Sequence, residues 1–225
     1  YVPQYWINYL NEKIETIRNL QMVDGTNRFS FAAITDIHYD NNFKRGYQIG
    51  KKVLDACNID IFMLLGDLHN DLVSKEEALR TLREVMSDFK STNKLIFPVV
   101  GNHDDNGYHT NPDQVGVLAN IITKGEQYSE IFRHLGNKVV YGETGTYYYY
   151  DDVFNKVRYI GLDVMDLTYA DLGNGKCEWA LGYRNTQLNW FAHTALNVPS
   201  SDWSVIVFSH ASPYTQEVVG TDVTP

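Results

Sequence analysis

The chain has 225 residues, 44% of them hydrophobic, which is enough for one large folded domain with a substantial core. Its formal net charge of −9 disfavours the basic surface typical of proteins that bind nucleic acid, so an anionic ligand would have to be held through bound cations. No apolar stretch is long enough to cross a bilayer, and the two cysteines, Cys57 and Cys177, indicate no disulfide framework.

The first half of the chain alternates predicted helices and strands. An N-terminal amphipathic helix is expected within residues 1–25. The core is expected to start at about residue 29, with strands over 29–35, 59–65 and 95–100. A helix over 46–57 joins the first two strands, and a helix capped by Ser74 and Glu77 precedes the third. This order is typical of strand–helix–strand units.

The second half of the chain predicts a sheet of a different kind. Two runs, 147–151 and 156–163, flank a short polar turn and predict a β-hairpin, so this sheet should be partly antiparallel. The four tyrosines at 147–150 are better explained by packing within a strand than by base stacking. The other expected elements are a polar loop over 106–113, a helix over about 117–135, a helix over 186–196 and a buried strand over 203–208.

Polar clusters follow each of the first three predicted strands. They are Asp36 and His38 after the first strand, residues 66–70 after the second and residues 101–104 after the third. Because the carboxyl ends of strands in an open α/β sheet border one crevice, we expect the three clusters to lie close together. Carboxylate and amide oxygens combined with imidazole suit Mn, Fe, Zn or Co, and the absence of cysteine argues against a structural zinc site. The sequence therefore predicts a catalytic metal centre.

These clusters carry a family resemblance. The motifs Asp36-x-His38, Gly66-Asp67-x-x-Asn70, Gly101-Asn102-His103-Asp104 and the later Ser209-His210 resemble those of the calcineurin-like metallophosphoesterase superfamily. The resemblance extends from about Phe29 to Pro213. It implies a four-layer α/β/β/α sandwich of two mixed sheets in a single domain over 1–225. It also implies a phosphatase or phosphodiesterase that acts on a small phosphate ester.

The resemblance also implies roles for individual residues. It implies two metal ions, which would be Mn, Fe or Zn. One ion would be bound by Asp36 and His38 and the other by Asn102 and His210, and Asp67 would bridge the two. A hydroxide bridging the ions would attack phosphorus. His103 would stand just off the metals, stabilising charge or protonating the departing oxygen, and either Asn70 or Asp71 would orient it. Tyr108 and His109 could line the substrate cleft beside Asn102 and His103.

One motif of the superfamily is missing from the sequence. The closing Gly-His-x-His is absent, and no histidine follows His210. Each metal site is then one protein ligand short, and C-terminal strands of the second sheet are expected to be missing. We expect a truncated piece of a longer phosphoesterase, poorly active or self-associating as a homo-oligomer through the open sheet edge.

Other interpretations of these residues remain open at this stage. Taken singly, Asp67 and Asn102 could be ordinary turn residues, and His69, His134 and His193 are treated as non-ligands. The main alternative function is a catalytically degenerate domain that serves as a binding module. A further alternative is a single-metal hydrolase that acts on a non-phosphate ester. The sequence does not indicate a compartment, and the cytoplasm is the default expectation.

Overall fold

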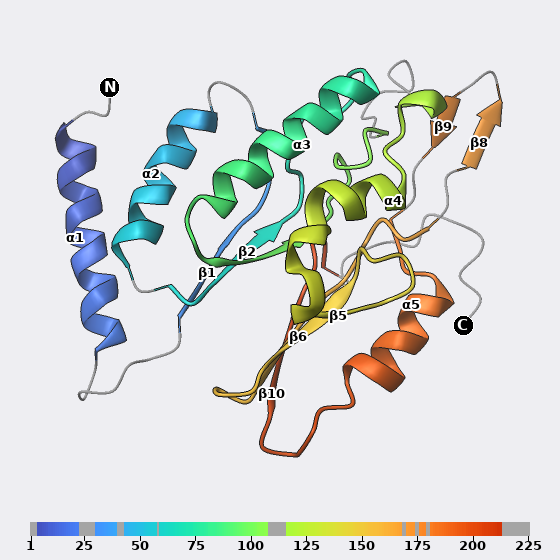
Figure 1. Cartoon of the computed structure of the whole chain (residues 1–225). Coiled ribbons are helices and arrows are strands. Elements are labelled where there is room, and N and C mark those ends of the chain that lie inside the picture. Colours follow the sequence, from blue (N-terminus) through green and yellow to red (C-terminus); the bar gives the residue numbers. More distant parts are fainter. Residues whose placement is uncertain are drawn as a thin grey trace.

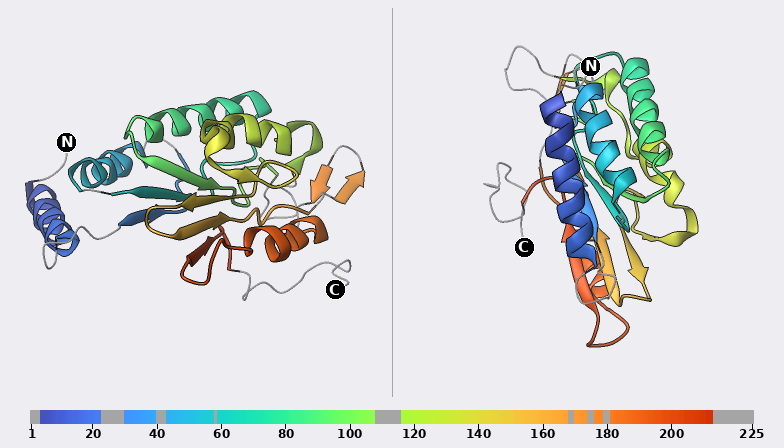
Figure 2. Two further views of the ribbon diagram at one scale, coloured as in Figure 1. Left: turned by 60° about the horizontal axis from the view of Figure 1, so that its bottom comes forward. Right: turned by 90° about the vertical axis from the view of Figure 1, so that its left-hand side faces the viewer.

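The computed structural model describes residues 4–22, 30–39, 43–57, 59–107, 116–167, 170–173, 176–178 and 181–212. Two sheets lie face to face between layers of helices (Figures 1 and 2). The first sheet has the strand order β1 (Phe31–Ile34), β2 (Ile61–Leu65) and β3 (Leu95–Val99). The second has the order β10 (Ser204–Phe208), β7 (Val157–Gly161), β6 (Tyr148–Asp152) and β5 (Val140–Tyr141). The predicted four-layer sandwich is confirmed.

The two sheets differ in how their strands pair. The second sheet is mixed as predicted, since β10 pairs parallel with β7 while β6 pairs antiparallel with β7 and with β5. The sequence predicted mixed pairing in the first sheet too, and this detail is corrected, because β1, β2 and β3 are parallel throughout. The reason is that both connections in this sheet are helical crossovers, which return the chain in the same direction.

Helices cover both outer faces of the sandwich. They are α1 (Gln4–Gln21), α2 (Phe43–Ala56), α3 (Lys75–Lys90), α4 (Lys124–Gln127) and α5 (Asn185–Trp190). In the left view of Figure 2, α3 and α4 lie on one side of the sheets and α5 on the other. The N-terminal helix α1 flanks α2 (Figure 1). Arg18 Nε on α1 donates a hydrogen bond of 2.7 Å to the Ala56 carbonyl at the end of α2.

The helix predicted over 117–135 starts later than expected. Residues 118–120 form a 3₁₀ turn, and the helix begins at Lys124, continuing through a π-helical turn and a 3₁₀ segment to Lys138. The reason is a capping box: Thr123 accepts from the Glu126 backbone N–H while the Glu126 carboxylate accepts from the Thr123 backbone. A small antiparallel sheet, which the sequence analysis did not predict, consists of β4 (Gly116–Val117), β9 (Lys176–Glu178) and β8 (Ala170–Gly173).

Aromatic rings fill the space between the two main sheets. The ring of Phe97 on β3 lies 6.0 Å from that of Tyr148, 5.1 Å from that of Tyr150 and 5.7 Å from that of Tyr159. The alternate tyrosines point the other way, since Tyr147 and Tyr149 contact Trp190 on α5. Side chains on both faces of this segment therefore pack against other rings, and Tyr148, Tyr149 and Tyr150 lie in β6, so the strand-packing interpretation of residues 147–150 is confirmed.

Replacing Phe97 with alanine should lower the free energy of unfolding by about 3–5 kcal/mol, because it empties the centre of the inter-sheet core. Phe154, on the turn between β6 and β7, is the matched control, since it is 93% exposed. Its replacement with alanine should change stability by no more than about 0.5 kcal/mol. Urea unfolding of both variants measures the contrast, and equal effects would contradict this account of the core.

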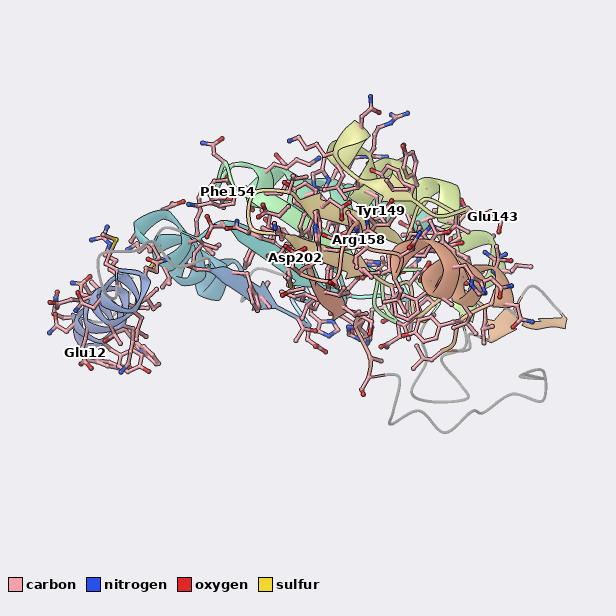
Figure 3. All side chains as sticks on the ribbon, turned by 90° about the horizontal axis from the view of Figure 1, so that it is seen from below. Glu12, Glu143, Tyr149, Phe154, Arg158 and Asp202 are labelled. Atoms are coloured by element: carbon pink, nitrogen blue, oxygen red, sulfur yellow. The ribbon has the colours of Figure 1, made fainter. Side chains whose placement is uncertain are left out.

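A buried arginine ties α5 to the second sheet. Arg158 on β7 forms an ion pair of 2.6 Å with Asp151 on β6, and its guanidinium lies 3.9 Å above the Tyr149 ring (Figure 3). Its Nη1 donates hydrogen bonds to the carbonyls of Ala195 and Asn197, at 2.9 and 3.0 Å. A cation here satisfies the carbonyls at the carboxyl end of the helix that α5 begins.

The outer edges of the two sheets are protected to different degrees. On β3, the Pro98 carbonyl accepts from Tyr148 Oη at 2.8 Å, and His134 Nε2 lies 3.1 Å from the Ile96 carbonyl. On β10, no strand pairs with the outer side among the described residues, and Val205 and Val207 are 37% and 45% exposed. The predicted homo-oligomer through an open edge therefore stays a prediction.

Candidate metal centre

The loops that follow β1 and β2 are held side by side by their backbones. The amide of Asp36 donates to the Gly66 carbonyl at 3.1 Å, and the amide of His38 donates to the Asp67 carbonyl at 2.9 Å. Asp36, His38 and Asp67 have φ values of 53°, 41° and 53°, in the left-handed region that non-glycine residues rarely adopt. Such conformations persist where the surrounding structure enforces them, and they cluster at functional sites.

Glycines allow the second and third loops to approach one another. A Cβ on Gly101 would lie 2.2 Å from Asp67 Oδ1 and 2.5 Å from the Asp67 backbone nitrogen. A Cβ on Gly66, whose φ is +86°, would lie 2.6 Å from the Gly101 nitrogen. Because the two loops approach so closely, Gly66 and Gly101 leave no room for a side chain.

Asp104 connects the loops that follow β2 and β3 by accepting hydrogen bonds from a backbone amide of each. This fully buried carboxylate accepts the Leu68 amide at 2.6 Å through Oδ1 and the Gly101 amide at 2.8 Å through Oδ2. Burial and the neighbouring Asp67 charge raise the pKa of Asp104 to about 8. No role was predicted for Asp104 from the sequence, although its position at the end of the third motif could have indicated one.

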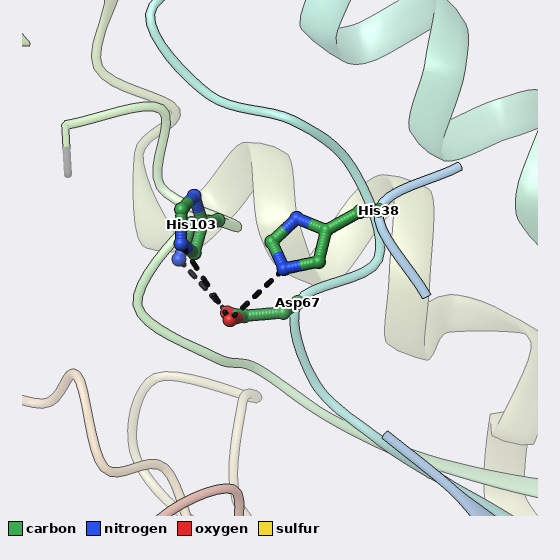
Figure 4. Close-up of side chains that lie close together, drawn as sticks. All are labelled: His38, Asp67 and His103. Atoms are coloured by element: carbon green, nitrogen blue, oxygen red, sulfur yellow. Dashed lines mark hydrogen bonds and ion pairs between the residues drawn. The ribbon is translucent and has the colours of Figure 1, made fainter. Parts of the chain in front are cut away.

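Asp67 lies at the middle of the site. Its buried carboxylate accepts the His103 amide at 3.0 Å through Oδ1. Its other oxygen, Oδ2, lies 3.8 Å from His38 Nε2, 3.7 Å from His103 Nε2 and 3.5 Å from His210 Nε2. Figure 4 shows the rings of His38 and His103 converging on this oxygen. One oxygen of Asp67 is thus fixed by the backbone, and the other faces three imidazoles.

Two groups of candidate ligands share Asp67. The ligand atoms of His38, Asp67 and His103 lie within 4.8 Å of one another, and so do those of Asp36, Asp67 and His210. Asn102 joins the second group, since its Oδ1 lies 3.0 Å from His210 Nε2. The donor set of imidazole nitrogens and carboxylate and amide oxygens fits Mn, Fe, Zn or Co.

The grouping differs in one respect from the one that the resemblance implied. Asn102 and His210 meet as expected, and Asp67 belongs to both groups as a bridge would. Asp36, however, falls in the group of His210, and His38 falls in the group of His103. His103 is thus as close to Asp67 as the residues that the resemblance assigned as ligands.

Asp71 is the carboxylate that lies beside His103 Nδ1. Its Oδ1 lies 3.1 Å from His103 Nδ1, whereas Asn70 is exposed. Burial lowers the pKa of the His103 imidazole, but the contact with Asp71 and the negative charge of Asp67 outweigh it, so the net pKa is raised. The sequence left open whether Asn70 or Asp71 orients His103, and in the structure Asp71 is the one that contacts the ring.

Comparison with known proteins identifies the family of this chain. A sequence profile described as calcineurin-like phosphoesterase matches residues 29–224. The chain belongs to this family. This phosphoesterase also resembles the crystal structure of a dimetal phosphatase from Danio rerio, with a TM-score of 0.56 and 14% identity over 81% of this chain and 69% of that chain. At that identity the likeness shows the fold alone. No curated protein matches the sequence.

Family membership confirms the resemblance inferred from the motifs, and it supports metal-dependent hydrolysis of phosphoric esters in general terms. The family implies two divalent metal ions, and the donor set described above fits them. In the part of the phosphoesterase that the structure describes, no helix combines the length and apolarity needed to span a membrane.

The remaining histidines of the phosphoesterase lie in varied settings. His69 is buried, its Nδ1 contacts the Asn70 carbonyl, and burial lowers its pKa to about 4. His134 lies in a 3₁₀ segment against β3, and His193 is exposed after α5. Tyr108 and His109, predicted to line the substrate cleft, lie outside the described residues.

Replacing Asp71 with asparagine in the phosphoesterase should lower turnover by about tenfold to a hundredfold, because His103 loses the carboxylate that holds Nδ1. Metal binding through Asp67 should persist. Asn70→Ala is the matched control on the same loop, and it should leave turnover within about twofold, because its side chain faces solvent. Steady-state kinetics of the two variants checks this. A larger loss in Asn70→Ala would restore Asn70 as the orienting residue.

Proposed function

We propose that this phosphoesterase hydrolyses phosphoric esters at a dinuclear metal centre, with a water-derived nucleophile between the ions. The proposed ligands are Asp36, His38, Asp67, Asn102 and His210. The observation that carries the proposal is the position of Asp67, since it belongs to both ligand groups with Oδ2 directed at three imidazoles. A carboxylate shared in this way is what a two-metal hydrolytic centre requires.

The metal ions and the protein groups have different roles in the proposed reaction. Two ions, once bound, would supply a nucleophile from water at neutral pH and would neutralise the phosphoryl oxygens, so no protein nucleophile would be needed. The chain fixes the ligands: the His103 amide holds Asp67 Oδ1, and the Leu65 carbonyl lies 2.8 Å from His210 Nδ1. Ligands held by such contacts lose little freedom on binding a metal, which favours affinity.

His103 and Asp71 are proposed as the proton-handling pair of the substrate complex. The His103 imidazole lies at the edge of the ligand groups, and Asp71 fixes its orientation through Nδ1. There it can stabilise the negative charge that develops on the substrate, or protonate the departing oxygen. Asn70 is proposed only as a neighbour of this pair, since its side chain is exposed.

The test measures metal content and turnover together. The protein is purified with Mn or Zn present, its metal content per chain is determined, and hydrolysis of p-nitrophenyl phosphate and bis(p-nitrophenyl) phosphate is measured. Two equivalents of metal with turnover of either ester support the proposal, and the preferred ester separates a phosphatase from a phosphodiesterase. Metal binding without turnover would favour the degenerate binding module. One equivalent, with no inhibition by phosphate or vanadate, would favour a single-metal hydrolase of another ester.

A further inference from the structure

We propose that Tyr39 is a positioning residue of the metal centre, which acts through the hydrogen bond between its hydroxyl and Asp88 on α3. Tyr39 itself binds no ion in this proposal. It fixes the segment that follows β1, residues 36–39, so that Asp36 and His38 are held in place before a metal ion binds. The inference rests on the proposed function, because it concerns ligands of the same centre.

The side chains of residues 36–39 alternate between the site and the core. Asp36 is exposed and His38 is half-buried, and both belong to the candidate ligand groups. Ile37 and Tyr39 are 1% and 8% exposed, and both belong to the main hydrophobic core. Each neighbour of His38 in the chain is therefore a core residue, so a shift of Tyr39 would move the backbone of His38 directly.

The backbone of this segment needs support from its surroundings. Asp36 and His38 both have positive φ values, a conformation that persists in non-glycine residues only where neighbouring contacts enforce it. The amides of Asp36 and His38 donate to carbonyls in the loop after β2, and the amide of Tyr39 donates to the Leu68 carbonyl at 3.1 Å. These three backbone contacts connect one loop with another loop. They do not connect the segment with a helix.

The hydroxyl of Tyr39 supplies a contact with a helix. It donates to Asp88 Oδ2 on α3, which lies 49 residues further along the chain. A hydrogen bond to a carboxylate is stronger than one between neutral groups. The helix itself is fixed by a buried apolar face, which consists of Ala78, Leu82, Val85, Met86 and Phe89. Asp88 therefore holds the Tyr39 ring in place, and the Tyr39 backbone holds that of His38.

The test compares metal affinity in two tyrosine variants. Tyr39→Phe removes the hydroxyl and keeps the ring. Tyr141→Phe is the matched control, because Tyr141 Oη also donates a part-buried hydrogen bond, of 2.9 Å, to the Phe132 carbonyl. Co²⁺ is titrated by calorimetry into the metal-free form of each protein. We expect Tyr39→Phe to weaken binding of one equivalent by about tenfold, and Tyr141→Phe to bind within about twofold of the unaltered chain.

Thermal unfolding with chelator present separates positioning from stability. Each tyrosine variant loses one hydrogen bond, so both should lose a similar amount of stability, whereas only Tyr39→Phe should lose metal affinity. Amide hydrogen exchange of the metal-free protein is a readout that needs no ion. Exchange over residues 36–39 should be faster in Tyr39→Phe than in the unaltered chain, and it should be unchanged in Tyr141→Phe.

Variants of Asp88 test the hydrogen bond from its other end. Asp88→Asn keeps an oxygen that can accept from the Tyr39 hydroxyl, so its affinity for Co²⁺ should stay close to that of the unaltered chain. Asp88→Ala should bind as weakly as Tyr39→Phe. The double variant of Tyr39→Phe and Asp88→Ala should bind no more weakly than either single variant, because both substitutions remove the same bond.

The unaltered chain distinguishes failure of this inference from failure of the proposed function. If the unaltered chain binds two ions and Tyr39→Phe binds them equally well, the inference is wrong and the proposed function stands. An equal loss of affinity in Tyr141→Phe would also overturn the inference, because the effect would then follow stability alone. Failure of the unaltered chain to bind Co²⁺ would overturn the proposed function and the role of Tyr39 with it.

Discussion

Replacing Asp67 with asparagine should abolish two-metal binding and lower turnover by about three orders of magnitude or more. Both ligand groups include Asp67, so one substitution removes a negatively charged donor from each. The amide keeps an oxygen that can accept the His103 N–H in place of Oδ1, so the loop geometry is retained. A thousandfold loss corresponds to about 4 kcal/mol of transition-state stabilisation, the scale expected when metal assistance is lost.

The Asp67→Asn result is interpretable only if the variant folds. With chelator present, its free energy of unfolding should match that of the unaltered chain or exceed it slightly, because a buried charge has been removed. Metal content measured by atomic absorption and hydrolysis of p-nitrophenyl esters complete the comparison. Two equivalents of metal in Asp67→Asn would show that Asp67 is not the shared ligand, and the proposed centre would then be wrong.

Replacing Gly101 with alanine should also inactivate the protein, for a steric reason. The new methyl group would lie 2.2 Å from Asp67 Oδ1 and 2.5 Å from the Asp67 backbone nitrogen, closer than any real Cβ contact. Because a backbone atom is involved, the loops must separate and the Asp67 carboxylate must turn. We expect a loss of about 1–3 kcal/mol in the free energy of unfolding and loss of metal binding.

Gly125 gives a matched control for this substitution. It lies in α4, and a Cβ there would meet nothing within 4 Å. Gly125→Ala should therefore raise the free energy of unfolding by about 0.5–1 kcal/mol and leave metal binding unchanged, since alanine favours the helix. Chemical denaturation and metal titration of both variants test the pair. A Gly101→Ala protein that binds two ions normally would contradict the account of the loops.

Much of the fold could be predicted because local signals and burial agree. The apolar runs at β2 and β3 are buried along their length, and Ser74 caps α3 where the capping pair placed its start. The late start of the helix at Lys124 was missed, although Thr123 and Glu126 carry the same signal. The small sheet of β4, β8 and β9 could not be predicted, because strands of two to four residues are too short for any periodicity.

The structure brings the predicted site residues together, but it groups them differently from what the resemblance implied. Motif spacing brought Asp67 and Asn102 to neighbouring strand ends. It could not decide between Asn70 and Asp71 as the partner of His103, because the two residues are adjacent in the loop and only the geometry of the turn brings one of them beside the ring. Nothing in the side-chain pattern indicated that Asp36 and His38 fall in different ligand groups, or that both have positive φ values.

The candidate ligands come from both sheets of the sandwich. Asp36, Asp67 and Asn102 follow strands of the first sheet, whereas His210 follows β10 in the second. An ion shared by Asp67 and His210 would therefore act as a cross-link between the two halves of the molecule. At a free ion concentration one hundred times the dissociation constant, such a link would add about 2.7 kcal/mol to stability. The lifetime of the protein against proteases would then depend on the supply of metal.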